Sequence, residues 1–91
     1  MSYVRTTLEG TVTRGGEPLA RAYVQLRDTD GEFTGEWRTR ADGAYQFNLP
    51  PGAWNVVVLT AGGAKVEHAV EVAPDGGTRL DIEMEPAAPA P

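Results

Sequence analysis

Any catalysis or metal binding by this chain would have to use carboxylates, hydroxyls and a single imidazole. The sequence holds no cysteine and one histidine, His68, so it has no disulfide, no thiolate ligand and no cysteine nucleophile, and it cannot build a multi-histidine metal site. His68 alternates in phase with Val66 and Val70, which favours a semi-buried or edge imidazole, and no serine stands near it to be activated. We therefore expect no catalytic residue and no cofactor.

An acidic segment at residues 28–32, Asp-Thr-Asp-Gly-Glu, has oxygen ligands at alternating positions, as the start of a calcium loop does. An EF-hand loop needs glycine at its sixth position and glutamate at its twelfth. Here glycine is fourth and the twelfth residue is Thr39. The segment lies between two alternating runs, so we predict a plain turn and no metal site.

Paired carboxylates also occur toward the end of the chain. Asp81 and Glu83 share one strand face, and Glu67 and Glu71 can lie opposite them. Such pairs perform glycoside hydrolysis only inside a cleft, which outward positions on a flat sheet do not make. We interpret these carboxylates as solvated charge.

Outward-facing apolar residues are the strongest functional signal. Val57 and Leu59 point away from the core phase of their strand, and Tyr23 leaves the core phase of its own. If these strands are neighbours, the three side chains form an apolar patch that favours a partner or self-association. The alternative is that a loop or the segment around Tyr3 covers them.

Two arginines could add an anchor to that patch. Arg38 and Arg40 share one outward face of their predicted strand, where they could bind an anion or an acidic patch on a partner. The alternative is ordinary solubility and cross-strand pairing with acids.

Alternation with a period of two residues dominates the chain and helical spacing is almost absent. Seven short strands, separated by Gly, Pro and Asp turns at roughly ten-residue spacing, predict an all-β antiparallel sandwich. The strand at 54–60 is apolar on both faces, so it should be central and covered. We predict one domain, residues 1–85, followed by a Pro/Ala-rich disordered tail at 86–91, with strands at 4–13, 19–27, 33–40, 45–49, 54–60, 65–73 and 78–85.

Charge and hydropathy restrict the partners. The 91 residues include 8 Lys and Arg against 13 Asp and Glu, a net charge of −5, which disfavours nucleic acid and anionic membranes. Residues 1–40 balance six arginines against six acids, so the whole excess lies in residues 41–91. Nothing approaches the ~20-residue apolar stretch of a membrane helix, and the first residues contain no apolar signal core. We expect a cytoplasmic protein.

One stretch resembles the carboxypeptidase regulatory-like domain. It combines an Asp42-Gly43 turn, alternating Tyr45 and Phe47, a Pro51-Gly52 reversal and Trp54 two residues later. The resemblance spans roughly residues 4–85 and implies a seven-stranded Greek-key sandwich of transthyretin- or immunoglobulin-like type. Gly43 would make the hairpin, and the aromatic residues would meet in the core.

A closer resemblance runs through residues 9–18, 23–33 and 51–54. These segments look like a small actinobacterial family of unknown function whose genes often lie beside thiosulfate sulfurtransferase genes, and which has itself been labelled a sulfurtransferase. The chain lacks the cysteine often seen near that family's N-terminus. Rhodanese chemistry needs a persulfide-forming cysteine, so this chain alone is not expected to catalyse sulfur transfer.

Taken together, the sequence predicts a non-catalytic module that acts by protein–protein association. The expected partner is another cytosolic protein, with a sulfurtransferase implied only by the resemblance, or a second copy of the chain. Two alternatives stay open. One is a carbohydrate- or peptide-binding module that stacks ligands on Tyr23 or Trp37, and the other is a small hydrolase that uses His68 with a carboxylate.

Overall fold

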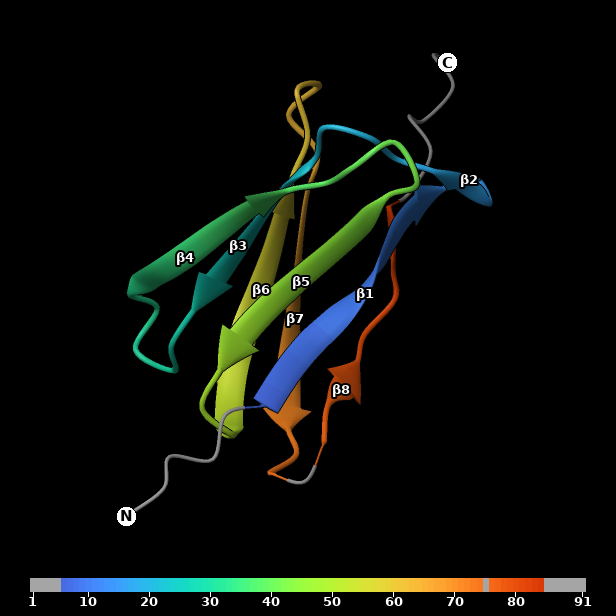
Figure 1. Cartoon of the computed structure of the whole chain (residues 1–91). Coiled ribbons are helices and arrows are strands. Elements are labelled where there is room, and N and C mark those ends of the chain that lie inside the picture. The colour runs from blue at the N-terminus through green and yellow to red at the C-terminus, as the bar shows by residue number, and fades with distance from the viewer. Residues whose placement is uncertain (1–5, 75, 85–91) are drawn as a thin grey trace.

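The computed structural model describes residues 6–74 and 76–84 and shows two β-sheets packed face to face (Figure 1). The predicted all-β sandwich is confirmed. The strands are β1 Thr6–Arg14, β2 Glu17–Pro18, β3 Tyr23–Arg27, β4 Phe33–Arg38, β5 Ala44–Leu49, β6 Gly52–Leu59, β7 Lys65–Val72, β8 Thr78–Arg79 and β9 Ile82–Met84.

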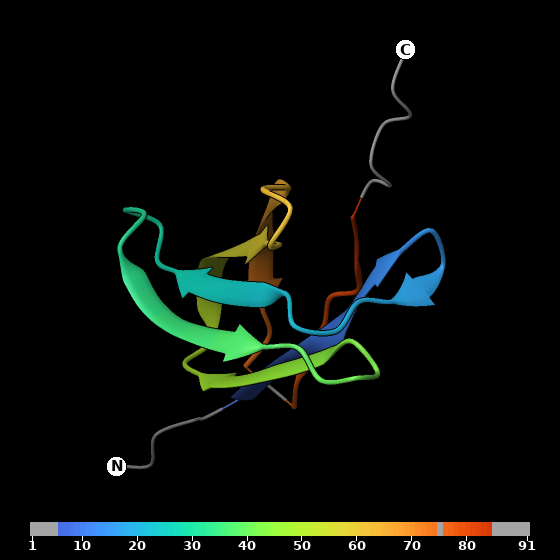
Figure 2. The same cartoon turned by 90° about the horizontal axis from the view of Figure 1, so that it is seen from above.

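The four-stranded sheet has the order β4-β3-β6-β7, with every neighbouring pair antiparallel. This places β6 in the interior of its sheet, as its two apolar faces predict. In the five-stranded sheet β1 is central. It pairs antiparallel with β5 and then with β2, and parallel with β8 and β9. Seen from above, β4 curves toward β5 at one margin of the sandwich (Figure 2).

The core lies between the sheets and follows the predicted alternation. Every second residue of β1 is buried, from Thr6 to Val12, and β3 buries Val24 and Leu26 in the same way. Burial of these side chains is the main favourable term for a chain this short. The largest fully buried side chains are Tyr45, Leu8, Ile82, Met84, Val12, Val24, Val56, Val58 and Val72.

The last predicted strand, 78–85, is interrupted at Leu80 and Asp81, and it runs parallel to β1 rather than antiparallel to a neighbour. The Tyr45 hydroxyl crosses above Gly10 and donates a hydrogen bond to the Leu80 carbonyl. The Asp81 carboxylate takes the place of a backbone carbonyl, accepting from the Thr11 N–H at 2.9 Å and the Thr11 hydroxyl at 3.1 Å. These side-chain bonds and a backbone bond from the Leu80 N–H to the Glu9 carbonyl at 2.9 Å hold the interrupted segment against β1.

The two ionisable groups at this interruption have shifted pKa values. Burial, and secondly the charge of Asp81, raises the pKa of the Tyr45 hydroxyl well above its usual range, against the lowering effect of Arg79. Burial also opposes ionisation of the Asp81 carboxyl, but hydrogen bonds from Arg79 and Thr11 outweigh it and hold the pKa of that carboxyl below its ordinary value. Asp81 is therefore an acceptor, and Tyr45 a donor, throughout the neutral range.

Asp81→Asn is expected to change how stability depends on acidity. Since folding lowers the pKa of Asp81, its ionised form stabilises the fold above the unfolded pKa, and this contribution disappears as the pH falls through the folded pKa. The side chain is 55% exposed, so the effect should stay below about 1 kcal/mol. The free energy of unfolding, measured by urea titration, should be higher for the wild type than for the variant at pH 6. The difference should be smaller near pH 3. A difference that is constant with pH would contradict this assignment.

The described residues contain no helix long and apolar enough to cross a membrane. The predicted tail at 86–91 and the segment around Tyr3 lie outside the described residues.

Candidate interaction surface

The outer face of the four-stranded sheet carries four of the five predicted contact residues, and three of them lie in one row. The register places Tyr23 beside Arg38 of β4 on one side and Leu59 of β6 on the other, and Leu59 is paired in turn with Lys65 of β7. This row crosses all four strands and has an apolar centre between two cations. We call it the Tyr23 row.

A second row lies one pleat along the same face. Gln25 is paired with Glu36 on one side and Val57 on the other, and Glu67 completes the row. The Gln25 amide donates to the Glu36 carboxylate at 3.1 Å, and the Lys65 ammonium lies 3.5 Å from a Glu67 oxygen. The ends of this row are acidic where those of the Tyr23 row are basic, so the two rows compensate each other in charge.

Val57 does not form part of an exposed patch, and the expectation that it does is wrong. Only 3% of the residue is exposed. Its position is outward-facing, but the register sets the long side chains of Gln25 and Glu67 directly on either side of it, and these cover a residue as short as valine. The exposed apolar surface therefore centres on Tyr23, which is 37% exposed, and on the half-buried Leu59.

Arg38 holds the Tyr23 ring in place. The guanidinium carbon lies 5.3 Å from the ring centroid, a cation–π contact worth about 0.5–1 kcal/mol at an exposed site. The contact adds a hydrogen-bonding cation to the apolar surface. Arginine beside tyrosine is a pairing that is enriched where proteins bind one another.

Arg40 does not share this face with Arg38. Strand β4 ends at Arg38, and Thr39 is buried, with its hydroxyl accepting from Ala22 N–H at 2.9 Å and donating to Leu19 carbonyl at 2.7 Å. The chain turns there, and the Arg40 guanidinium lies 5.5 Å from the centroid of the Trp37 ring. With Trp37 and Arg79, Arg40 lines a separate cavity of about 140 Å³, so the predicted two-arginine site does not form.

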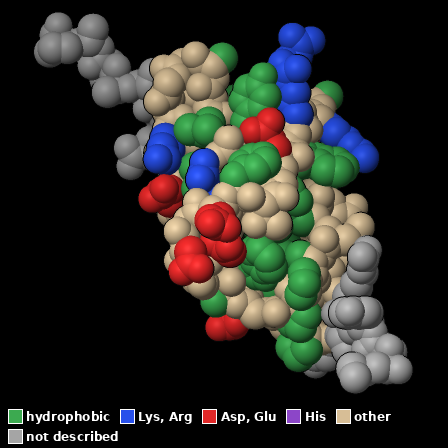
Figure 3. All heavy atoms as spheres, turned by 90° about the vertical axis from the view of Figure 1, so that its left-hand side faces the viewer, with side chains coloured by type: hydrophobic (Ala, Val, Ile, Leu, Met, Phe, Trp, Pro, Cys, Tyr) green, Lys and Arg blue, Asp and Glu red, His purple; other side chains and the backbone are tan. Residues whose placement is uncertain are grey.

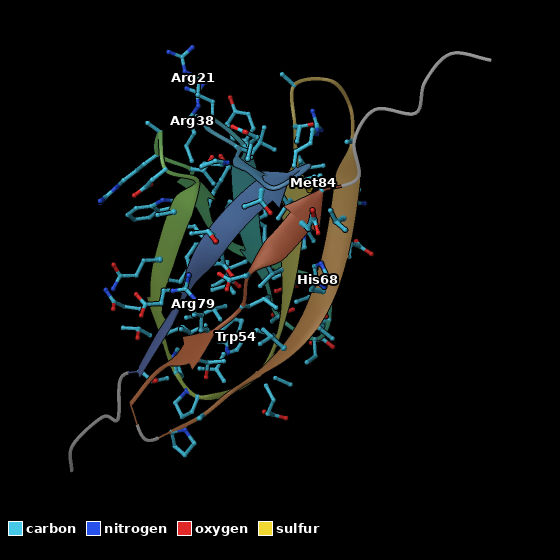
Figure 4. The ribbon with its side chains drawn as sticks, turned by 90° about the vertical axis from the view of Figure 1, so that its right-hand side faces the viewer. Arg21, Arg38, Trp54, His68, Arg79 and Met84 are labelled. Carbon is cyan, nitrogen blue, oxygen red and sulfur yellow. The ribbon has the colours of Figure 1, made fainter. Side chains whose placement is uncertain are left out.

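Charge is unevenly distributed along the four-stranded sheet, a feature that counts by chain half did not reveal, and the cation at its acidic end is Arg27, which donates to the Gly31 carbonyl. Arg21, Arg38 and Lys65 lie at the end where β3 and β7 begin, and Figure 4 shows Arg21 and Arg38 together at this end. The opposite end carries the acidic residues of the β3–β4 turn. It also carries Glu71, near the C-terminal end of β7. On the side that carries β4, Figure 3 likewise shows Lys and Arg toward the top and most Asp and Glu lower down.

The acidic segment at 28–32 is a turn, as predicted. One oxygen of the Asp28 carboxylate accepts hydrogen bonds from the backbone N–H groups of Asp30 and Glu32, both at 2.9 Å, and Gly31 adopts a positive φ of 84°. The carboxylate is thereby used to close the turn. Within residues 6–74 and 76–84, no group of three or more His, Asp or Glu side chains is placed to hold a metal ion.

Among the described residues, the carboxylate pairs considered for glycoside hydrolysis do not meet, and His68 Nε2 makes no bond to a carboxylate. The His68 Nε2 atom is buried and has no hydrogen-bond partner within the described part of the chain. Glu67 and Glu71 lie on the exposed side of β7, whereas Asp81 and Glu83 belong to the segment that pairs with β1 in the other sheet. The prediction that Glu67 and Glu71 can face the other pair is therefore wrong.

The two aromatic residues named for ligand stacking lie on opposite faces of their sheet. Tyr23 is on the outer face, whereas Trp37 points inward from β4 and donates its indole N–H to the Ala44 carbonyl of β5 at 3.2 Å. This bond ties the margins of the two sheets together. Tyr23 and Trp37 thus form no continuous stacking row.

Comparisons with known sequences identify relatives whose roles are themselves uncharacterized. A family model described as "Protein of unknown function (DUF1416)" matches residues 3–84. An uncharacterized protein of Mycolicibacterium smegmatis is 34% identical over 83 residues, which cover 90% of this chain and 89% of that protein. An uncharacterized protein of Mycobacterium tuberculosis is 37% identical over 59 residues, which cover 64% of this chain and 59% of that protein.

Solved structures with the same fold come from proteins of diverse kinds. The Bacillus anthracis TIE protein matches with a TM-score of 0.77 at 20% identity, over 90% of this chain and 17% of its own. The minor pilin of Streptococcus agalactiae matches with a TM-score of 0.77 at 17% identity, over 98% of this chain and 48% of its own. The dioxygenase domain of a Streptomyces carbohydrate-binding fusion protein matches with a TM-score of 0.76 at 15% identity, over 94% and 82%. At these identities the likeness establishes the sandwich fold alone.

Proposed function

Since this chain belongs to the DUF1416 family of proteins of unknown function, we propose that it is a non-catalytic protein-association module and that the outer face of its four-stranded sheet is the contact surface. The observation that carries the proposal is the Tyr23 row, in which an exposed tyrosine and a half-buried leucine lie between Arg38 and Lys65. An aromatic and aliphatic centre with a charged rim is the usual anatomy of a protein contact.

The chemistry of this face defines the partner that it fits. An apolar side chain of the partner would cover Tyr23 and Leu59, and acidic groups would meet Arg21 and Arg38 at the basic end of the sheet. Basic groups would meet Glu71 at the other end. This distribution of charge fixes the orientation of docking and accelerates encounter more than it adds affinity.

A sulfurtransferase is one partner of this kind, and it is proposed on the family resemblance. The division of labour is set by the sequence, since this chain has no cysteine and a persulfide needs one. The partner would therefore supply the nucleophile, and this chain would supply a docking surface. The expected location of such a pair is the cytoplasm.

The test is a double substitution, Tyr23→Glu with Leu59→Glu. The new carboxylates would sit between Arg38 and Lys65, so the fold should tolerate them, while the apolar centre is lost. Partners that purify with the tagged wild-type protein, quantified by mass spectrometry, should fall at least about tenfold, as expected when central contact residues are removed. Val57 is unsuitable for this purpose, because a charge at a position 3% exposed would destabilise the fold.

The matched control is Gln46→Glu with Asn48→Glu. Both residues are exposed on β5 in the other sheet, so the net charge changes equally while the Tyr23 row stays intact. This control should retain the wild-type partners. If both double variants keep the same partners at the same levels, the outer face of the four-stranded sheet is not the contact surface.

A further inference from the structure

Strand β7 forms a long, regular edge of the four-stranded sheet. Among the residues that the structure describes, it pairs only with β6, in an unbroken register from Lys65 to Val72. It contains no proline, glycine or bulge along its eight residues. An edge like this presents a row of backbone N–H and C=O groups that can template another strand.

The margins at β4 and β9 are better protected. Strand β4 carries a register shift against β3 near Phe33, and its Trp37 indole is bonded to the Ala44 carbonyl of β5. Strand β9 has only three residues. Bulges and short edge strands discourage pairing, and β7 has neither of them, although it carries the charged side chains of Lys65, Glu67 and Glu71.

The sandwich is also incompletely closed along β7. Val66, His68 and Val70 face the core side of this strand, yet each is only partly buried. Figure 4 shows His68 on β7 at this margin, below Met84 of β9. A cavity of about 390 Å³, lined by Ala64, Lys65, Val66 and Met84, lies between the two strands. Apolar surface at an open margin gains stability when a further strand covers it.

One polar atom on the core side of β7 has no hydrogen-bond partner among the residues that the structure describes. The His68 Nε2 atom is buried without a hydrogen-bond partner within residues 6–74 and 76–84. A buried nitrogen without a partner costs free energy.

We propose that β7 pairs antiparallel with β7 of a second copy of this chain, with His68 opposite the same residue of the second copy on the two-fold axis. The pairing would join the two four-stranded sheets into one continuous sheet of both copies. It uses the edge of the sheet rather than its outer face, and Lys65 is the one residue that contributes to both this pairing and the Tyr23 row.

The sequence of β7 selects this register. With His68 on the axis, Lys65 lies opposite Glu71 at both ends, Glu67 lies opposite Ala69, and Val66 lies opposite Val70 on the core side. A shift of two residues in one direction places Glu67 opposite itself, and a shift in the other places Glu67 opposite Glu71. Like charges directly opposite each other are destabilising in a sheet. A one-residue shift would turn the core side outward.

Charge reversal tests the pairing, with mass measured by sedimentation or light scattering across a concentration series. Lys65→Glu and Glu71→Lys alone should each raise the dimer dissociation constant about tenfold, because two cross-strand attractions become repulsions. The double variant, Lys65→Glu with Glu71→Lys, should recover most of the affinity. Both side chains are exposed, so the monomer fold should tolerate the changes. Singles and double that dimerise equally would overturn the proposed register.

The absence of native cysteine allows a second readout that does not depend on affinity. Under mild oxidation, His68→Cys should yield a disulfide-linked dimer, because a residue on the axis faces its own copy within disulfide range. Ala69→Cys is the matched control. In the proposed register this position faces Glu67 of the second copy and lies about 8 Å from the equivalent position there, which is too far to cross-link. Efficient cross-linking by Ala69→Cys alone would overturn the register.

A wild type that stays monomeric at about 1 mM, while His68→Val dimerises, would also overturn the proposal. His68 would then be an inward polar group that blocks the edge. Tyr23→Glu alone separates the two proposals, because it leaves Leu59 and Lys65 unchanged and should therefore lose partners and still dimerise.

Discussion

Gly10→Ala is expected to lower the free energy of unfolding by about 3 kcal/mol or more. A Cβ atom at this position would lie 1.9 Å from the Leu80 carbonyl oxygen and 3.1 Å from the Tyr45 ring. The first of these atoms belongs to the backbone of a neighbouring strand segment, so it cannot move without breaking the Tyr45 hydrogen bond to the same carbonyl. One methyl group would thereby separate β1 from the segment between β8 and β9.

Gly35→Ala is the matched control. Gly35 is also a strand glycine without a positive φ, but its Cβ would meet the Phe47 ring at 3.8 Å, which is an ordinary contact. Thermal unfolding should show a Tm for Gly10→Ala lower by at least about 12 °C, whereas Gly35→Ala should stay within a few degrees of the wild type. Equal Tm values for the two variants would mean that the contact at Gly10 relaxes freely.

Tyr45→Phe is expected to cost about 1–3 kcal/mol, because it keeps the buried ring and leaves the Leu80 carbonyl without its donor. The free energy of unfolding from urea titration is the appropriate measurement. In the Gly10→Ala background the same change should cost clearly less, since the carbonyl has already been displaced. Strict additivity of the two substitutions would contradict the idea that they act on one contact.

The alternation of side chains was sufficient to predict most of the fold. Strand β6 reads as apolar on both faces, and it lies between β3 and β7 in its sheet. The turn at Asp42 and Gly43 also forms as predicted, with Gly43 at a φ of 76° and the Asp42 carboxylate accepting from the Ala44 N–H. These features are local, so periodicity and turn chemistry specify them.

What alternation could not supply was register. Val57 has an outward phase, but its exposure depends on which residues stand beside it on β3 and β7, and these turn out to be Gln25 and Glu67. The apolar character of both faces of β6 was already a signal that Val57 would be covered. The contact of Tyr23 with Arg38 depends on register in the same way, because Arg38 stands beside Tyr23 only when β4 pairs with β3 as it does here.

The interruption between β8 and β9 was missed for a different reason. Leu80, Ile82 and Met84 alternate perfectly with charged residues, so the sequence reads as one strand. Its interruption follows from long-range side-chain bonds to Thr11 and from Tyr45, residues distant along the chain. Side-chain alternation also does not show whether a strand runs parallel or antiparallel to its neighbour.

That parallel arrangement determines how the module would respond to mechanical load. Strands β1 and β9 run side by side in one direction, with Arg14 beside Met84, so Thr6 and Met84 lie at opposite ends of the sandwich. A pull that draws these two residues apart loads the β1–β8 and β1–β9 hydrogen bonds in shear. Bonds loaded in shear share the tension and must break together, whereas bonds peeled from one end break one after another. Tension applied through the chain would therefore meet its greatest resistance at the seam beside β1.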